Sequence, residues 1–176
     1  MLRSLSELAD AGVHPRVVDA VRSVSSRLQR EGVRHAVVGA LAVGVYGWPR
    51  ATRDVDLLLA DDAWNHHPDG SMEPRIELPE EVGGVGIDYL PLDVAGEFLS
   101  VAFERPLLSE GVPIAPPEVV ACTKLLRLAM RDQADLVEMI KAGVVDVGMI
   151  RAFLVAHTPM LVGRWDALIE QAARES

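Results

Sequence analysis

Two aspartates stand two residues apart at the start of a predicted β-strand, Asp54–Leu59. Because side chains alternate along a strand, the carboxylates of Asp54 and Asp56 leave the same face, while Val55 and Leu57 point toward the predicted core. Two like charges this close repel each other, and such a pair is tolerated where it faces solvent or a cation. The spacing therefore predicts a site for a hard divalent cation, completed by phosphate oxygens and water.

A third carboxylate, Asp88, interrupts an otherwise apolar strand predicted over residues 85–90. Burying a lone carboxylate is costly, so this residue needs either a partner or a function. One interpretation gives Asp88 a functional role. The other leaves it exposed to water on an edge strand.

The residues before the aspartate pair predict the elements that position it. An apolar strand over residues 36–38 ends at Gly39, a residue type that tolerates a sharp exit from a strand. A short helix over residues 40–46 follows and is closed by Gly47, and a loop over residues 48–53 leads into the strand with the aspartates. Backbone N–H groups at the start of such a helix point toward a bound phosphate.

These residues together resemble the minimal nucleotidyltransferases of the DNA polymerase beta-like superfamily, and within it the AbiEii/AbiGii-type, toxin-like proteins. The shared pattern is a glycine, a short helix, the sequence GWPRAT (residues 47–52) and the sequence DVDL (residues 54–57). Many proteins of this type are toxins of toxin–antitoxin or abortive-infection systems.

The resemblance implies transfer of a nucleoside monophosphate from a nucleoside triphosphate (NTP) to an acceptor, with Mg²⁺ or Mn²⁺ as the cofactor. It assigns catalysis and metal binding to three carboxylates, Asp54, Asp56 and Asp88. In the superfamily the third carboxylate lies on a strand next to the aspartate pair, and on this ground we expect Asp88 to be functional. It assigns nucleotide or phosphate binding to six residues: Gly39, Ala40, Arg50, Thr52, Lys124 and Arg131.

A second segment, residues 119–140, extends the resemblance to a helix pair that carries Lys124, Arg131, Asp132 and Asp135. If this segment is one continuous helix, Lys124, Arg131 and Asp135 share a face. The buried stripe beside that face would consist of Cys122, Leu125, Leu126 and Ala129. A row of this kind is either a solvated salt-bridge face or a set of phosphate ligands, and both interpretations stay open.

Ala40 departs from the pattern of the superfamily, in which glycine or serine usually follows the glycine. Alanine has no hydroxyl group to offer a phosphate, although its backbone N–H is retained. We expect the turn to work through its N–H groups, and whether Ala40 abolishes activity stays open.

The composition limits the classes of protein that fit. The chain has 176 residues, 49% apolar residues and a single cysteine, so it can form a substantial core and no internal disulfide. No apolar run reaches the roughly 20 residues that span a bilayer, and residues 1–7 lack the apolar core of a signal peptide. We therefore expect a cytoplasmic protein without a membrane partner. The net charge of the whole protein is −9, and a field of this sign would repel nucleic acid.

The predicted fold class is α/β (α+β): a nucleotidyltransferase-like mixed β-sheet with flanking helices and a C-terminal helical bundle. Residues 1–115 form the predicted α/β core, and residues 116–176 a helical region packed on it. A hairpin is predicted from strands over residues 75–78 and 85–90, separated by Pro79 and the pair Gly83-Gly84.

The leading hypothesis is a metal-dependent nucleotidyltransferase whose acceptor is tRNA or protein, with a cognate antitoxin as a candidate partner. A second hypothesis keeps the chemistry and makes the acceptor a cationic small molecule of the aminoglycoside type, which suits the acidic chain. A third is a relative that binds nucleotides or partners without catalysis; Ala40 favours it and the three carboxylates oppose it.

Overall fold

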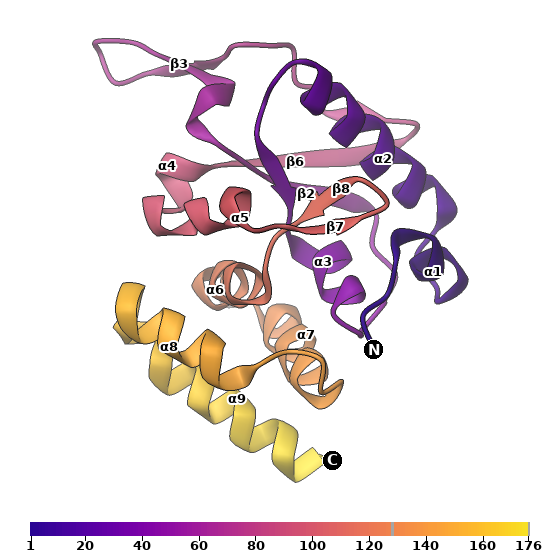
Figure 1. The fold of residues 1–176 in the computed structure, drawn as a ribbon, viewed down its shortest axis with the longest axis vertical. Coiled ribbons are helices and arrows are strands. Elements are labelled where there is room, and N and C mark those ends of the chain that lie inside the picture. The colour runs from indigo at the N-terminus through magenta and orange to yellow at the C-terminus, as the bar shows by residue number, and fades with distance from the viewer. Residues whose placement is uncertain (128, 176) are drawn as a thin grey trace.

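The computed structural model describes residues 1–127 and 129–175, and its centre is a six-stranded sheet in the order β5-β6-β2-β1-β8-β7 (Figure 1). β2 runs parallel to β6 and antiparallel to β1, and β1 runs parallel to β8, so the sheet is mixed. Its strands are β1 (His35–Val37), β2 (Asp54–Leu59), β5 (Glu81–Val82), β6 (Val85–Pro91), β7 (Leu107–Ser109) and β8 (Val112–Ile114). β3 (Trp64–His66) and β4 (Met72–Pro74) form a separate two-stranded hairpin that projects from the molecule.

Helices flank the sheet and form the C-terminal part of the described chain. In Figure 1, α2 lies above the sheet, and α3 and the C-terminal helices lie below it. The described helices are α1 (Leu5–Asp10), α2 (Pro15–Arg30), α3 (Gly39–Val45), α4 (Leu92–Ala95), α5 (Val101–Glu104), α6 (Pro117–Arg127), α7 (Met130–Lys141), α8 (Val147–His157) and α9 (Val162–Glu175). This architecture confirms the predicted mixed α/β class with C-terminal helices.

Helix α2 covers the sheet with an apolar face. The ring of His14 accepts a hydrogen bond from the backbone N–H of Arg16, and Pro15 begins the helix. Both features suit a helix start, where proline costs no backbone hydrogen bond. The buried positions recur every three or four residues: Val17, Val18, Val21, Val24 and Leu28. This spacing turns one face of the helix toward the core.

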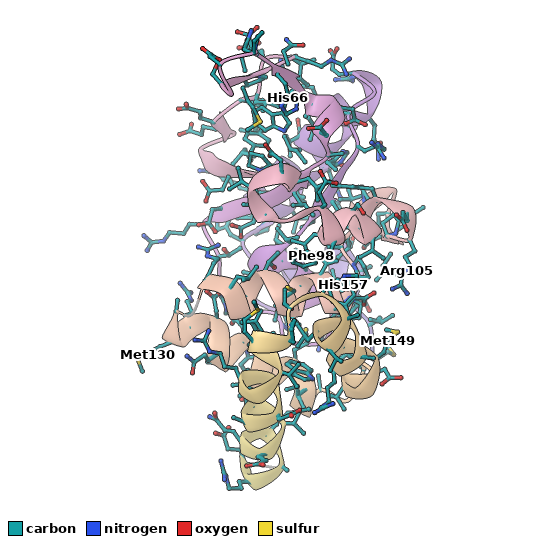
Figure 2. All side chains as sticks on the ribbon, turned by 90° about the vertical axis from the view of Figure 1, so that its left-hand side faces the viewer. His66, Phe98, Arg105, Met130, Met149 and His157 are labelled. Carbon is teal, nitrogen blue, oxygen red and sulfur yellow. The ribbon has the colours of Figure 1, made fainter. Side chains whose placement is uncertain are left out.

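The C-terminal helices pack through large side chains. Trp165 is fully buried on α9 and donates its indole N–H to the backbone oxygen of Val147 at 3.1 Å. Between α8 and the residues after α4, the rings of Phe98 and His157 stack with centroids 5.6 Å apart, and Figure 2 shows them side by side. The first contact holds α9 against α8, and the second joins α8 to the α/β part of the chain. None of the helices in residues 1–127 and 129–175 has the length and apolar character to cross a membrane.

One expectation about secondary structure is wrong, and another depended on a continuous helix that does not form. The partner of β6 in the hairpin is β5 rather than residues 75–78, because Gly83 and Gly84 take positive φ angles of 61° and 80° and make a tight two-residue turn. The segment 119–140 forms the helix pair that the resemblance implies, α6 and α7, with Ala129 in an extended conformation before α7. A continuous helix face therefore does not form: Cys122 and Leu125 of the predicted stripe are buried, whereas Leu126 and Ala129 are exposed.

Candidate functional site

The three predicted carboxylates lie on adjacent parallel strands. Asp56 of β2 is in register with Asp88 of β6, and Asp54 precedes Asp56 by two residues on the same strand. Because residues in register on parallel strands point to the same face, all three side chains leave one side of the sheet. Asp54 and Asp88 are exposed, and the side chain of Asp56 is 19% exposed.

Asp56 packs against the backbone of Gly39 at the start of α3. The backbone N–H of Val38 donates to the backbone oxygen of Asp56 at 3.0 Å, which holds the turn after β1 beside β2. Gly39 has a φ of +65°, and a Cβ atom added there would lie 1.9 Å from Oδ2 of Asp56. Both the backbone conformation and the lack of space require glycine at this position.

Replacing Gly39 with alanine should therefore destabilise the protein by about 1–3 kcal/mol, because it adds a backbone strain and a collision with Asp56. The matched control is Gly32→Ala, since Gly32 has a similar φ of +70° and open space around it. Urea unfolding followed by circular dichroism gives both values. Equal losses for the two variants would contradict the close packing between Gly39 and Asp56.

The carboxylate of Asp56 is electrostatically unfavourable where it lies. Burial raises the pKa of Asp56 above its ordinary value, and the neighbouring charges of Asp54 and Asp88 raise it further. The guanidinium of Arg127 acts in the opposite direction. A group in this state gains more than an exposed aspartate from a bound cation.

Two residues of the loop before β2 position other groups of the site. The hydroxyl of Thr52 donates to Oδ1 of Asp54 at 2.7 Å. Arg50 forms a bidentate pair with Asp135, with Nε 2.5 Å from Oδ1 and a terminal nitrogen 2.6 Å from Oδ2. The guanidinium fork of arginine matches the two oxygens of a carboxylate, so this pair ties the loop firmly to α7.

Lys124 lies at the centre of a buried charge network. Its side chain is 4% exposed, and Nζ lies 2.8 Å from Oδ1 of Asp132 and 2.7 Å from Oδ2 of Asp135. Burial by itself would raise the pKa of Asp135, but hydrogen bonds from Arg50 and Lys124 outweigh it and lower the pKa. The packing of α6 against α7, and not one continuous helix face, brings Lys124 to Asp135.

Arg127 and Arg131 bring two further positive charges to the site. A terminal nitrogen of Arg127 lies 3.6 Å from Oδ1 of Asp56, and Nε lies 4.0 Å from Oδ2 of Asp132. Arg131 is exposed and donates to the backbone oxygen of Ala51 at 3.4 Å. Arg127 was not predicted as a site residue, although it lies three residues after Lys124 and thus on the same side of a helix.

Two adjoining cavities, which we call the aspartate cleft, are lined by Arg127, by Asp132 and by the predicted site residues. The larger cavity has a volume of about 610 Å³ and the smaller one about 150 Å³; Gly39, Asp56 and Lys124 line both. The larger cavity has an apolar wall of Val38, Tyr89, Leu90, Val94, Ala95 and Leu126. Every site residue that the sequence predicts lines one cavity or both: Gly39, Ala40, Arg50, Thr52, Asp54, Asp56, Asp88, Lys124 and Arg131.

The carboxylates do not form a ready-made metal cage. In residues 1–127 and 129–175, no three side chains of His, Cys, Asp or Glu are arranged so that they could hold a metal ion by themselves. Mg²⁺ is commonly held by one or two carboxylates together with phosphate oxygens of a substrate. The carboxylates of the aspartate cleft suit that second arrangement.

Comparison with known proteins adds little to this geometry. No protein-family model matches the sequence, and no curated protein matches it. The crystal structure of an antigenic nucleotidyltransferase-like protein from Paracoccidioides brasiliensis is 16% identical, with a TM-score of 0.46 and with 95% of each chain covered. A likeness this distant carries no conclusion about the activity of this chain, and membership of the AbiEii-type family stays a prediction.

Proposed function

We propose that this chain is a metal-dependent nucleotidyltransferase that moves a nucleoside monophosphate from an NTP to an acceptor hydroxyl group. The observation that carries the proposal is the register of Asp56 with Asp88 across two parallel strands, with Asp54 on the same face. These carboxylates line a cleft that also holds exposed arginines and an apolar wall. A nucleotide has matching parts: a metal-bound triphosphate and a flat, largely apolar base.

The donor set of the aspartate cleft fits Mg²⁺ or Mn²⁺. Asp54, Asp56 and Asp88 offer the carboxylate oxygens that hard divalent cations prefer. The raised pKa of Asp56 reflects a carboxylate that is crowded by like charges and that a cation would relieve. When bound, such an ion would neutralise the charge that develops on the transferred phosphoryl group and on the leaving pyrophosphate.

The other residues of the aspartate cleft would bind the phosphates or position the cleft walls. The exposed guanidinium of Arg131 and the backbone N–H groups at Gly39 and Ala40 would hold the phosphates, so the missing hydroxyl at position 40 costs little. Arg50 and Lys124 are paired with carboxylates, which suits positioning of the cleft walls; direct phosphate binding by these two residues and by Thr52 stays a prediction.

The reaction balances without a further reagent. The acceptor oxygen forms a bond to the α-phosphorus of the NTP, the bond from that phosphorus to the bridging oxygen breaks, and pyrophosphate leaves. The acceptor proton passes to a carboxylate, and Asp88 suits this role because it is exposed beside Asp56. A base held in line with the attacking hydroxyl is the usual requirement of such transfers.

For the acceptor we propose tRNA or protein, as in the toxin-like proteins that the sequence resembles, with a cognate antitoxin as the corresponding partner. A cationic small molecule is the alternative that the net charge of −9 favours. A nucleotide-binding protein without turnover is the candidate from another class. The observation in its favour is that the described carboxylates form no three-ligand metal site on their own.

Label transfer tests the proposal directly. Purified protein is incubated with Mg²⁺ or Mn²⁺, each α-labelled NTP, and separate acceptors: tRNA, bacterial protein extract and aminoglycosides. We expect label on one acceptor class, released pyrophosphate, and loss of both in the double variant Asp54→Asn/Asp56→Asn. Asp19→Asn, an exposed aspartate on α2, is the matched control and should retain full transfer.

The same samples show whether the protein binds nucleotides without turnover. Calorimetry with Mg²⁺ and each NTP measures binding independently of any acceptor. Binding without transfer to any acceptor would favour the non-catalytic alternative. If the protein showed no transfer to any acceptor and no binding of any NTP, the proposed function would be contradicted.

A further inference from the structure

The positively charged side chains of the aspartate cleft differ greatly in how strongly their carboxylate partners hold them. Lys124 is buried between two carboxylates, and Arg50 makes a bidentate pair with Asp135. The side chain of Arg127, by contrast, is 67% exposed, and its distances of 3.6 Å to Asp56 and 4.0 Å to Asp132 exceed those of hydrogen bonds. Exposed ion pairs of this kind contribute little to stability, so Arg127 can leave its position at small cost.

Arg127 lies beside Oδ1 of Asp56, the carboxylate oxygen that a metal ion would bind. Oδ2 of Asp56 faces the backbone of Gly39, where even a single Cβ atom would lie 1.9 Å away. Oδ1 is the oxygen beside the guanidinium of Arg127. A divalent ion bound at Oδ1 and the positive charge of Arg127 would repel each other strongly at this separation.

The position of Arg127 is equally suited to a triphosphate. It is the last residue of α6, and it lines both cavities of the aspartate cleft. A guanidinium binds phosphate oxygens through two parallel N–H donors, which is a stronger contact than the loose one to Asp56. An incoming triphosphate would therefore draw Arg127 away from the carboxylate.

We propose that Arg127 is an exchangeable counter-ion, which pairs with Asp56 until metal and NTP arrive together and then turns to the triphosphate. This inference rests on the proposed function and adds a regulatory consequence to it. A metal ion without nucleotide must compete with Arg127 for Asp56, whereas a metal ion with nucleotide brings the phosphates that remove Arg127. The cleft thus prefers the metal–nucleotide complex over the free metal ion.

Two binding measurements on the full chain test this exchange. The affinity for Mn²⁺ alone is measured by electron paramagnetic resonance, and the affinity for Mg²⁺ with non-hydrolysable α,β-methylene analogues of the four NTPs by calorimetry. The variants are Arg127→Ala and Arg127→Lys. Arg164→Ala is the matched control, because it removes one exposed positive charge on α9, a helix that contributes no lining residue to the two cavities of the aspartate cleft.

Relative to the control, Arg127→Ala should bind Mn²⁺ about two- to fivefold more tightly, the range expected for loss of an exposed ion pair. It should bind the analogue about tenfold more weakly, because it lacks a charged phosphate ligand. Arg127→Lys keeps the charge and should bind Mn²⁺ as the wild type does.

Three results would overturn the proposal while leaving the proposed function intact. They are unchanged or weaker Mn²⁺ binding by Arg127→Ala, undiminished binding of the analogue by that variant, and equally tight Mn²⁺ binding by Arg127→Lys and Arg127→Ala. A wild-type protein that binds neither Mn²⁺ nor any analogue would instead overturn both the proposed function and this inference.

Discussion

Replacing Lys124 with methionine is expected to lower the free energy of unfolding by about 3–5 kcal/mol, the usual cost of removing one partner from a buried ion pair. Methionine has a similar length but no charge. It would leave Asp132 and Asp135 facing each other with only the arginines to balance them. Because Asp135 is almost fully buried, water cannot replace the lost ammonium group. Guanidinium chloride unfolding measured by tryptophan fluorescence gives the value.

The matched control for this variant is Lys141→Met. Lys141 also pairs with acidic side chains, Glu138 and Glu175, but these pairs lie at the surface, where water and salt weaken them. The control should unfold close to the wild-type midpoint. If both lysine variants lost the same small amount of stability, the network around Lys124 would not hold α6 to α7 as we infer.

Replacing Asp56 with asparagine should reduce nucleotidyl transfer by about 10³-fold, the magnitude for loss of a preorganised electrostatic group at the reacting centre. The same change should stabilise the folded protein by about 0.5–2 kcal/mol, as happens where a functional group is held in an unfavourable environment. Asparagine has the shape of aspartate and fits beside Gly39, but it carries no charge to repel Asp54 and Asp88. Transfer assays and urea unfolding measure the two effects on the same variant.

The gain in stability should depend on pH with a defined sign. The pKa of Asp56 is raised in the folded state by burial and by Asp54, so its charge opposes folding once the carboxyl group ionises. The contribution of the Asp56 carboxyl group to the free energy of unfolding is therefore greatest below its unfolded pKa of about 3.9. It is lost as the pH rises through the folded pKa. The free energy of unfolding of Asp56→Asn, relative to that of the wild type, should rise between acidic and neutral pH. That of Asp19→Asn should not. A gain that shrinks as the pH rises would refute this explanation.

The positions of the carboxylates could be predicted because they depend on local pattern. Alternation along β2 places Asp54 and Asp56 on one face, and the same alternation in β6 places Asp88 between buried Ile87 and partly buried Tyr89. The pairing of the two strands did not follow from alternation; it came from the family resemblance. Gly39 was predicted from its place at the end of a strand, but the closeness of Asp56 to its backbone is a tertiary contact that no local pattern encodes.

The charges on α6 and α7 show where local pattern is insufficient. Helix periodicity predicts which residues share a face only while the helix continues, and here α6 ends at Arg127. Lys124 meets Asp135 because two helices pack together, so the prediction of a shared face gave a correct neighbour for a wrong reason. Which charge is buried and which is exposed depends on this packing, and the sequence offered no means to separate Lys124 from Arg127.

The charge network also ties together parts of the chain that the sequence treats separately. Arg50 belongs to the loop before β2, whereas Lys124, Asp132 and Asp135 belong to the C-terminal helices. A single substitution at one of these positions leaves a buried charge without its partner, and a compensating change at another can restore the balance. Over evolutionary time these four positions should therefore change in concert. The C-terminal helices then evolve together with the loop that carries Arg50, and they cannot be replaced by unrelated helices without leaving buried charges unpaired.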